Sequence, residues 1–267
     1  MLRSFVVTFV IFLNTYSHIL ADDSKQLPEN TVIITAENWC PYTCMDTDKN
    51  RGLFVDILEA AFQEVGLQVR YDYMVSLNRA VQNIKNSMSD VLLGVYDDDH
   101  IEYIDIADEF YIYDETAFAV RKDSDVKLNE HKNLLNYKIG VISNYLYNGD
   151  NSWEESIEKH PGKVKVSGIN GESHLITLLL RKRFDIAVVN PDVINYTLRE
   201  TKQLSQIDII SKNILFKMYV GFAKTARGAE FRKKFKTGFI SLKKTNKLKV
   251  IYEKYDIEMP DFFTSKY

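Results

Sequence analysis

The pattern of apolar and polar positions predicts two successive units of alternating strands and helices. In the first unit, short β-branched or continuous apolar runs have the length and composition of strands at residues 31–36, 68–73 and 91–95. Apolar residues at helical spacing predict helices between them at 54–65 and 77–86. Strand and helix in alternation predict a parallel sheet with right-handed crossovers.

The same pattern starts again after residue 115. Strands are expected at 116–121, 138–142, 163–166, 184–189 and 214–223. Helices are expected at 153–160, 173–183, 192–200, 229–242 and 246–255. No Pro-, Gly- or Ser-rich tract separates the two units, which favours strands that cross between them over a flexible tether.

The first 21 residues have the layout of a secretory signal peptide. Arg3 gives a positive start, an apolar run extends from Phe5 to Leu13, and a polar stretch ends at Ala21. The apolar run is too short to span a bilayer, which takes roughly 20 residues. The residue directly after Ala21 is Asp22 and not a cysteine, so we expect no lipid anchor. The sequence therefore predicts cleavage near Ala21 and release into the periplasm.

Cys40 and Cys44 are the only cysteines, and export would bring them into an oxidising compartment. Their spacing suits a small loop closed by a disulfide, which would shape the loop more than stabilise the fold. A redox-active pair and a metal site are the alternatives. The spacing is not Cys-x-x-Cys, and no nearby histidine pair completes a metal site, so we favour the structural bridge and expect no metal.

Composition and charge favour a soluble binding protein over other classes. Apolar residues make up 45% of the chain and charged residues 27%, and the net charge of −3 argues against a nucleic-acid surface. Basic residues gather near the C-terminus, where they are expected to form solvated helix faces. No glycine-rich phosphate loop, Gly-x-Ser-x-Gly elbow or His-Glu-x-x-His motif occurs. We therefore expect a monomer with no catalytic residues and no cofactor.

Several short segments occur together in a characteristic order along the chain. They are Trp39-x-Pro41-Tyr42, Gly52-x-x-x-Asp56-Ile57-Leu58, Ser87-Met88-Ser89-Asp90-Val91-Leu92, Ile106-Ala107-Asp108-Glu109-Phe110-Tyr111, Lys138-Ile139-Gly140-Val141 and Arg183-Phe184-Asp185-Ile186-Ala187. Each segment alone is weak evidence, but the ordered set covers nearly all of the chain after Ala21. In this set the chain resembles the bacterial extracellular solute-binding proteins of the amino-acid-binding class, family 3, which have the type II periplasmic binding protein fold.

The resemblance implies an α/β fold of two lobes, each a mainly parallel sheet flanked by helices, joined by two crossing strands. Carried onto this chain, lobe one covers residues 22–118 and 219–267, and lobe two covers 119–218. The implied function is hinge closure on a small polar ligand, amino-acid-like or related, followed by delivery to an ABC-type membrane permease. The alternatives are a ligand-sensing subunit of a membrane receptor and, on the same fold, a periplasmic dehydratase.

The chain departs from the family where amino acids are usually held. The place of the arginine that binds the ligand carboxylate falls nearest His100, after three aspartates at 97–99 that would repel an anion. The place of an assisting threonine falls near Tyr145, and that of the aspartate that binds the amino group falls near Asn190. With all three altered, an ordinary α-amino acid is a doubtful ligand.

The predicted ligand-binding residues are aromatic, polar or cationic side chains near strand ends and helix starts. Aromatic residues after strand ends commonly line a cleft, although packing within their own loops is the alternative. Arg79, in the first turn of a helix, does not complement the helix dipole and is predicted to contact an anionic group; its alternative is a solvated helix residue. A lone histidine in an acidic loop is more often exposed. The set is Trp39, Tyr42, Arg79, Tyr96, His100, Tyr145 and Asn190.

Overall fold

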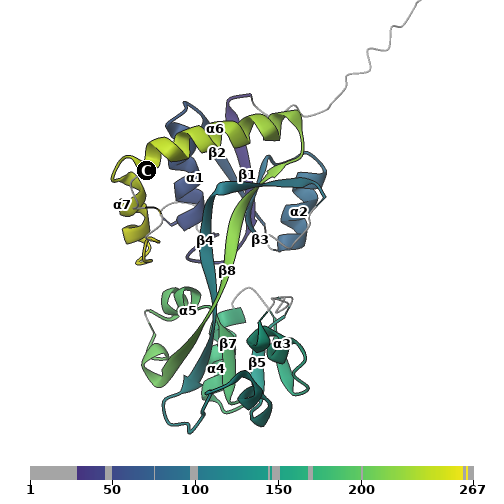
Figure 1. Ribbon diagram of the computed structural model, residues 1–267, viewed down its shortest axis with the longest axis vertical. Helices are drawn as coiled ribbons and strands as arrows, with labels where there is room; N and C mark the ends of the chain where they lie inside the picture. Colours follow the sequence, from purple (N-terminus) through teal and green to yellow (C-terminus); the bar gives the residue numbers. More distant parts are fainter. Residues whose placement is uncertain are drawn as a thin grey trace, which may run out of the picture.

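Two lobes joined by a pair of long strands make up the protein (Figure 1). The computed structural model describes residues 29–45, 50–74, 76–96, 102–143, 145, 151–167, 171–199, 201–260 and 263. The predicted signal peptide at 1–21 and His100 lie outside the described residues. The expected two-lobed α/β architecture is confirmed.

The strands of both lobes belong to one ladder of eight described strands in the order β2-β1-β3-β8-β4-β7-β5-β6. Their bounds are β1 Thr31–Glu37, β2 Gln68–Met74, β3 Val91–Tyr96, β4 Ile104–Arg121, β5 Ile139–Ile142, β6 Lys163–Val166, β7 Ile186–Val189 and β8 Ile207–Ala223. In lobe one β1 pairs in parallel with β2 and β3, and in lobe two β5 pairs in parallel with β6 and β7. Each lobe is therefore mainly parallel, as expected, and antiparallel pairs form only where β4 and β8 take part.

Helices flank the sheet of each lobe at positions close to those that the sequence predicts. They are α1 Leu53–Gln63, α2 Leu77–Lys85, α3 Ser152–Glu158, α4 Gly171–Leu180, α5 Pro191–Leu198, α6 Ala226–Lys243 and α7 Lys247–Lys254, with short 3₁₀ turns at His131–Asn136 and Leu204–Gln206. Side-chain caps define several starts, since Thr225 accepts a hydrogen bond from the Gly228 amide and Asn151 from that of Glu154. None of the described helices has the length and apolar character that crossing a bilayer requires.

The crossing strands are longer than the sequence predicts. β4 starts at Ile104 rather than at residue 116, and β8 starts at Ile207 rather than at 214. The hydrophobic pattern of the sequence does not reveal the first half of either strand. Each strand passes from one core to the other, so neither of its faces stays apolar along its whole length. β4 and β8 pair antiparallel almost throughout, with register shifts between Ala107 and Tyr111 and between Thr116 and Ala117.

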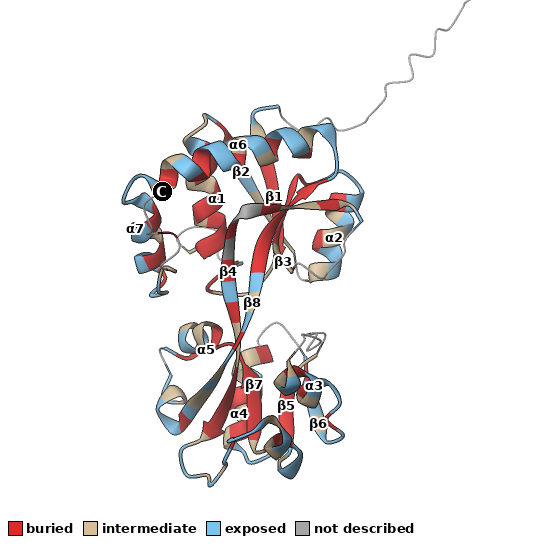
Figure 2. Ribbon diagram, viewed as in Figure 1, coloured by how far each residue is buried: buried red, intermediate tan, exposed pale blue. Residues whose placement is uncertain are grey.

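The two lobes have separate cores (Figure 2). The main lobe-one core is a cluster rich in phenylalanine, with Phe54, Phe62, Phe235 and Phe239 all buried, and a smaller cluster packs α2 against the other face of its sheet. Lobe two has two smaller clusters, and alternate residues of β7 contribute to each, so they cover opposite faces of its sheet.

Core membership shows where the crossing strands change lobe. Ile112 and Met218 face each other across β4 and β8, and both pack in the lobe-one core. Phe118 and Ile214 pack in a lobe-two core. Core membership therefore changes a few residues before 118 on β4 and between 214 and 218 on β8. These positions lie next to the expected boundaries at 118/119 and 218/219, which stay a prediction.

Candidate functional site

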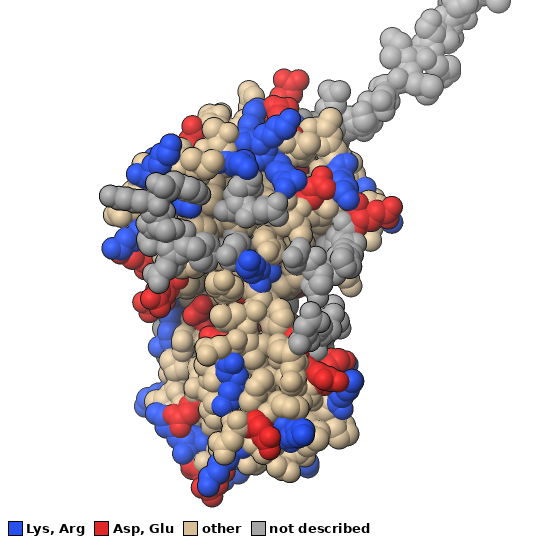
Figure 3. Space-filling view, in the orientation of Figure 1, with Lys and Arg blue, Asp and Glu red and all other residues tan. Residues whose placement is uncertain are grey.

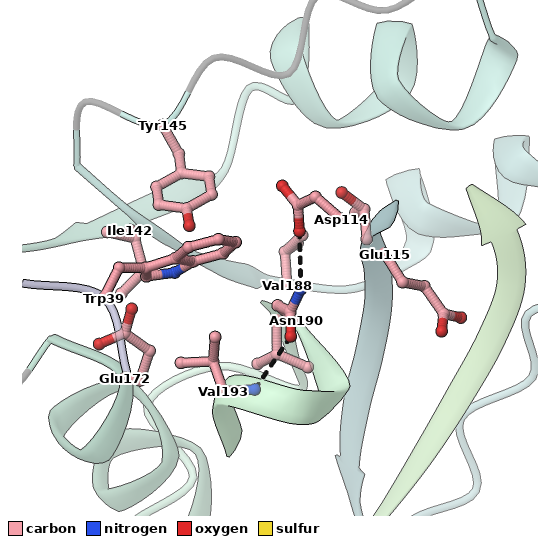
Figure 4. Close-up of a pocket in the computed structure, with 11 residues that line it drawn as sticks. Trp39, Asp114, Glu115, Ile142, Tyr145, Glu172, Val188, Asn190 and Val193 are labelled. Carbon is pink, nitrogen blue, oxygen red and sulfur yellow. Dashed lines mark hydrogen bonds between the residues drawn. The ribbon is translucent and has the colours of Figure 1, made fainter. Parts of the chain in front are cut away.

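A pocket lies between the lobes, beside the crossing strands (Figure 4). Trp39 reaches it from the loop after β1, and the middle of β4, the ends of β5 and β7 and the starts of α4 and α5 supply the rest. The lining residues are Trp39, Asp114, Glu115, Thr116, Ile142, Tyr145, Glu172, Val188, Val189, Asn190 and Val193. The carboxyl ends of parallel strands and the first turns of helices are where α/β proteins place ligands.

The pocket is narrow in this arrangement of the lobes. Its cavity has a volume of about 20 Å³, which is close to the space that one water molecule needs. An organic ligand therefore requires the lobes to move apart before it can enter.

A disulfide between Cys40 and Cys44 closes the loop that carries Trp39, as the sequence predicts. Inside this loop the Trp39 amide donates to the Thr43 carbonyl at 2.6 Å, and the Thr43 amide donates back at 3.0 Å. The Trp39 ring stacks on Tyr42 with 4.5 Å between ring centroids. The loop is thus fixed by covalent, backbone and aromatic contacts, and together these hold Trp39 at the pocket.

Gly52 lets the start of α1 approach this loop. Its φ of 106° lies in the left-handed half of the map, which side chains rarely adopt. A Cβ at this position would lie 2.3 Å from the Tyr42 carbonyl oxygen. The next two amides, of Leu53 and Phe54, donate to the carbonyls of Pro41 and Tyr42 at 2.8 and 3.0 Å, so the loop caps the helix.

Tyr42 joins the lobes rather than lining the pocket. Its ring is buried in the lobe-one core, and its hydroxyl donates to Asp192 Oδ2 of α5 at 2.6 Å. Burial, together with the negative charge of Asp192, raises the pKa of the Tyr42 hydroxyl well above its usual value, so it stays a donor. Next to Asp192, Val193 packs in the lobe-one core although it belongs to lobe two.

Asp114 is the buried carboxylate at the centre of the junction. One of its oxygens accepts from the Tyr96 hydroxyl at 2.6 Å, and the other accepts from the Asn190 amide at 2.7 Å. Burial raises the pKa of the Asp114 carboxyl, and these two hydrogen bonds oppose the rise. The Asn190 side-chain oxygen is also engaged, because it caps α5 by accepting from the Val193 amide at 2.9 Å. Asn190 therefore orients Asp114 and starts α5 at the same time.

Two further carboxylates face the junction from opposite lobes. Glu37 ends β1 and accepts from the Leu77 amide at 3.2 Å, at the start of α2. Glu172 lies in the first turn of α4 and lines the pocket. Burial raises the pKa of both groups, and the charge of Glu172 contributes a further rise at Glu37. The described lining residues include no Lys or Arg.

An aromatic pair closes the pocket across the lobes. Trp39 of lobe one and Tyr145 of lobe two have ring centroids 6.4 Å apart. In Figure 4 the Tyr145 hydroxyl points toward the Trp39 ring. The indole Nε1 of Trp39 is buried and has no acceptor within the part of the chain that the structure describes. An indole N–H in such a place normally finds a partner, so this donor is available to a ligand.

The structure brings together three of the predicted residues, Trp39, Tyr145 and Asn190, at the pocket wall. Tyr42 and Tyr96 do not line the pocket. Their hydroxyls donate hydrogen bonds to Asp192 and Asp114.

Arg79 does not join the predicted residues at the pocket. It is exposed on α2 and is absent from the lining residues, so the geometry gives no support to an anion contact there. In this arrangement it has the position of a solvated helix residue. A role for His100 remains a prediction.

Sequence reasoning missed the acidic residues of the site. A signal existed for Asp114 and Glu115, because two adjacent carboxylates interrupt a run of aromatic and apolar residues at 110–120. The sequence contains no such signal for Glu172, because an acidic residue in the first turn of a helix is ordinary. Its position at the pocket depends on how α4 packs against β5.

A second, larger groove lies between α5 and the chain that follows α7. Its volume is about 250 Å³, and its walls include Asp192, Tyr196, Arg199, Tyr255 and Ile257. The Arg199 guanidinium already stacks on Tyr196 at 4.1 Å. No strand end contributes to this groove, so the narrower pocket is the better candidate. Within the described residues no cluster of three metal-ligating side chains occurs.

The sequence matches the bacterial extracellular solute-binding proteins, family 3, over residues 31–258. The chain belongs to this family. The matched region includes both described lobes and every described residue of the pocket. A search of curated proteins finds no match.

Solved structures share the fold at low sequence identity. The arginine-, lysine-, histidine-binding protein ArtJ from Geobacillus stearothermophilus superposes with a TM-score of 0.66 at 20% identity, over 88% of this chain and 100% of that one. A histidine kinase sensor domain similar to periplasmic binding proteins gives 0.67 at 19% identity, over 85% and 96%. An ancestral amino acid-binding protein, a precursor of cyclohexadienyl dehydratase, gives 0.64 at 16% identity, over 85% and 95%. At these identities the likeness concerns the fold.

Proposed function

We propose that this solute-binding family member closes its two lobes on a small polar ligand and delivers it to an ABC-type permease without transforming it. The observation that carries the proposal is the position of the pocket. Its walls come from both lobes and from β4, the strand on which the lobes would rotate. Closure would complete the site and enclose the ligand in one step.

Contacts between the lobes support such a movement. The Tyr42–Asp192 hydrogen bond and the Trp39–Tyr145 ring contact both span the junction. They are few and partly polar, and interfaces of this kind allow relative motion of domains. A ligand that contacts both lobes would add to them and favour the closed arrangement.

A thermal-shift screen of amino acids, amines, organic acids, sugars and small peptides tests the proposal. A bound ligand should raise the melting temperature by mass action. Small-angle scattering of the same mixture should show a smaller radius of gyration, and chromatography should recover the ligand unchanged. A chemically altered product would favour the dehydratase alternative, and binding without compaction would contradict the closure mechanism.

A sensory role is the second candidate, and the similarity to a histidine kinase sensor domain favours it. Both roles require the same ligand binding. They differ in the membrane partner that recognises the closed form. Capture of membrane proteins with ligand-loaded protein should recover a permease for transport and a receptor for sensing.

We also infer export to the periplasm through cleavage near Ala21. The family is extracellular by description, and a disulfide-closed loop fits an oxidising compartment. Mass spectrometry of the mature protein should find an N-terminus close to Asp22. Soluble protein that retains Met1 would contradict this.

A further inference from the structure

We infer that the interlobe pocket takes a small organic cation, an amine whose binding does not depend on a ligand carboxylate. The inference rests on the proposed binding function and specifies its ligand class. It follows from which charges the junction buries, which groups compensate them, and which polar atom is left without a partner.

Among the described residues, negative charge at the junction is buried or half-buried without a cationic partner. Asp114 is 5% exposed, and its two partners, Tyr96 and Asn190, are neutral. Neither Asp114 nor Glu172 has an ion pair with a described Lys or Arg. Buried charges are normally paired, because desolvation of a lone ion is costly.

The same electrostatics disfavours an anionic ligand group. Burial raises the pKa of Asp114, Glu172 and Glu37 alike, and neighbouring carboxylates raise it further at Asp114 and Glu37, so the charges around the junction repel added negative charge. A ligand cation would reverse this effect, whereas a ligand carboxylate would add to it. On the face shown in Figure 3, Lys and Arg gather most densely over α6, at the end of lobe one remote from the junction, and others are spread over lobe two.

The rest of the wall suits an organic cation. In Figure 4 the carboxylates of Asp114 and Glu172 lie on different sides of the Trp39 ring, and that of Glu115 points away from it. An ammonium group beside either of the first two carboxylates would be close to the indole ring as well, whose face favours cations. The unpartnered Nε1 of Trp39 adds one donor, which suits a hydroxyl or carbonyl oxygen on the same ligand.

A series of four-carbon compounds tests the charge preference at constant chain length. Putrescine carries two ammonium groups, 1,4-butanediol two hydroxyls, succinate two carboxylates, and 4-aminobutyrate one ammonium and one carboxylate. Putrescine should raise the melting temperature the most and 4-aminobutyrate less, whereas 1,4-butanediol and succinate should cause no shift. L-ornithine, which adds an α-carboxylate to a diamine, should not bind better than putrescine.

Variants locate the cation within the pocket. Glu172→Gln should weaken putrescine binding about tenfold to hundredfold, the usual effect of losing a charge-assisted hydrogen bond. The melting temperature of the ligand-free variant should change little, because no described side chain is hydrogen-bonded to the Glu172 carboxylate and a glutamine oxygen can still accept from the backbone amide of residue 172. Glu29→Gln is the matched control, since Glu29 is exposed just before β1, at the end of that strand opposite the junction.

Four results would overturn the inference. They are a larger shift with succinate than with putrescine, ornithine binding without putrescine binding, unchanged putrescine affinity in Glu172→Gln, and no binding of any amine. If the amines fail but another solute binds and compacts the protein, the proposed binding function still stands. If no solute of any class shifts or compacts the protein, the proposed function fails as well.

Discussion

The two lobes differ in how they build their cores and in what they give to the pocket. Lobe one has one large core of stacked and edge-on phenylalanines between its sheet and the helices α1 and α6, with only a small aliphatic cluster under α2. Lobe two divides a mainly aliphatic core between the two faces of a sheet of short strands. At the pocket, however, lobe one supplies Trp39 alone, whereas lobe two supplies the ends of two strands and the starts of two helices.

This difference indicates that lobe one mainly provides rigid support for the pocket, whereas lobe two provides most of the groups that could recognise a ligand. The disulfide loop, the buried Tyr42 ring and the aromatic core hold one large side chain in a fixed place. Apart from Tyr145, the described lobe-two wall consists of smaller side chains together with the Glu172 carboxylate, and it would meet Trp39 when the lobes come together. We therefore expect lobe-one changes to act mostly on stability and changes at the junction to act mostly on closure.

The largest effect is expected in the lobe-one core. Phe235 is fully buried and has ring contacts with Phe62 at 5.9 Å and with Phe239 at 5.6 Å between centroids. Phe235→Ala should lower the free energy of unfolding by about 3–5 kcal/mol, measured by urea titration. Ile240→Ala, at an exposed position of the same helix, should change it by about 0.5 kcal/mol. Similar losses in both variants would contradict the role given to the aromatic core.

A smaller loss is expected where α1 approaches the Cys40–Cys44 loop. Gly52→Ala adds a Cβ at a positive φ and 2.3 Å from the Tyr42 carbonyl, so it should cost about 2–3 kcal/mol of unfolding free energy. Gly66→Ala is the control, because Gly66 has a φ of 74° with no atom near its Cβ position, and it should cost about 1 kcal/mol. Thermal denaturation of both variants measures the difference. Equal costs would mean that strain alone, rather than the contact with the loop, limits Gly52.

The smallest effect on stability, and the sharpest on closure, is expected at Tyr42. Tyr42→Phe keeps the buried ring and removes the hydrogen bond to Asp192 between the lobes, so it should cost about 1 kcal/mol. Because that bond favours the closed arrangement, the ligand-free variant should have a larger radius of gyration by small-angle scattering.

Tyr255→Phe provides the control for closure. It removes hydrogen bonds to Asp56 and Gly52 within lobe one, so it should lower stability without changing the radius. An unchanged radius in Tyr42→Phe would show that the Tyr42–Asp192 bond has no part in closure.

The sequence predicted the fold well because hydrophobic period and element order are local properties. Almost every helix and strand appears within a few residues of its expected place, and the Cys40–Cys44 bridge followed from spacing and compartment. The first halves of β4 and β8 were missed for a physical reason. A strand that passes from one core to another loses the regular alternation by which strands are found.

The site was only partly predictable, since it depends on residues far apart in the chain. Trp39, Tyr145 and Asn190 were found because aromatic and polar residues at strand ends have a general tendency to reach clefts. Asp114 and Glu172 belong to different elements and meet only after α4 packs on its strand. Arg79 was predicted as a ligand-binding residue from its charge and its position in a helix. Neither property tells whether the exposed side of α2 faces the pocket.

Asp114, Glu115 and Thr116 occupy β4 between its two register shifts, at the place where that strand passes from one lobe to the other. The residues that would contact a ligand are thus the residues about which the molecule would bend. Any substitution that changes which compound is preferred would also change the balance between open and closed forms. Ligand selectivity and the balance between open and closed forms would therefore depend on the same residues in this protein. A change in ligand preference would then be accompanied by a change in the conformation of the ligand-free protein.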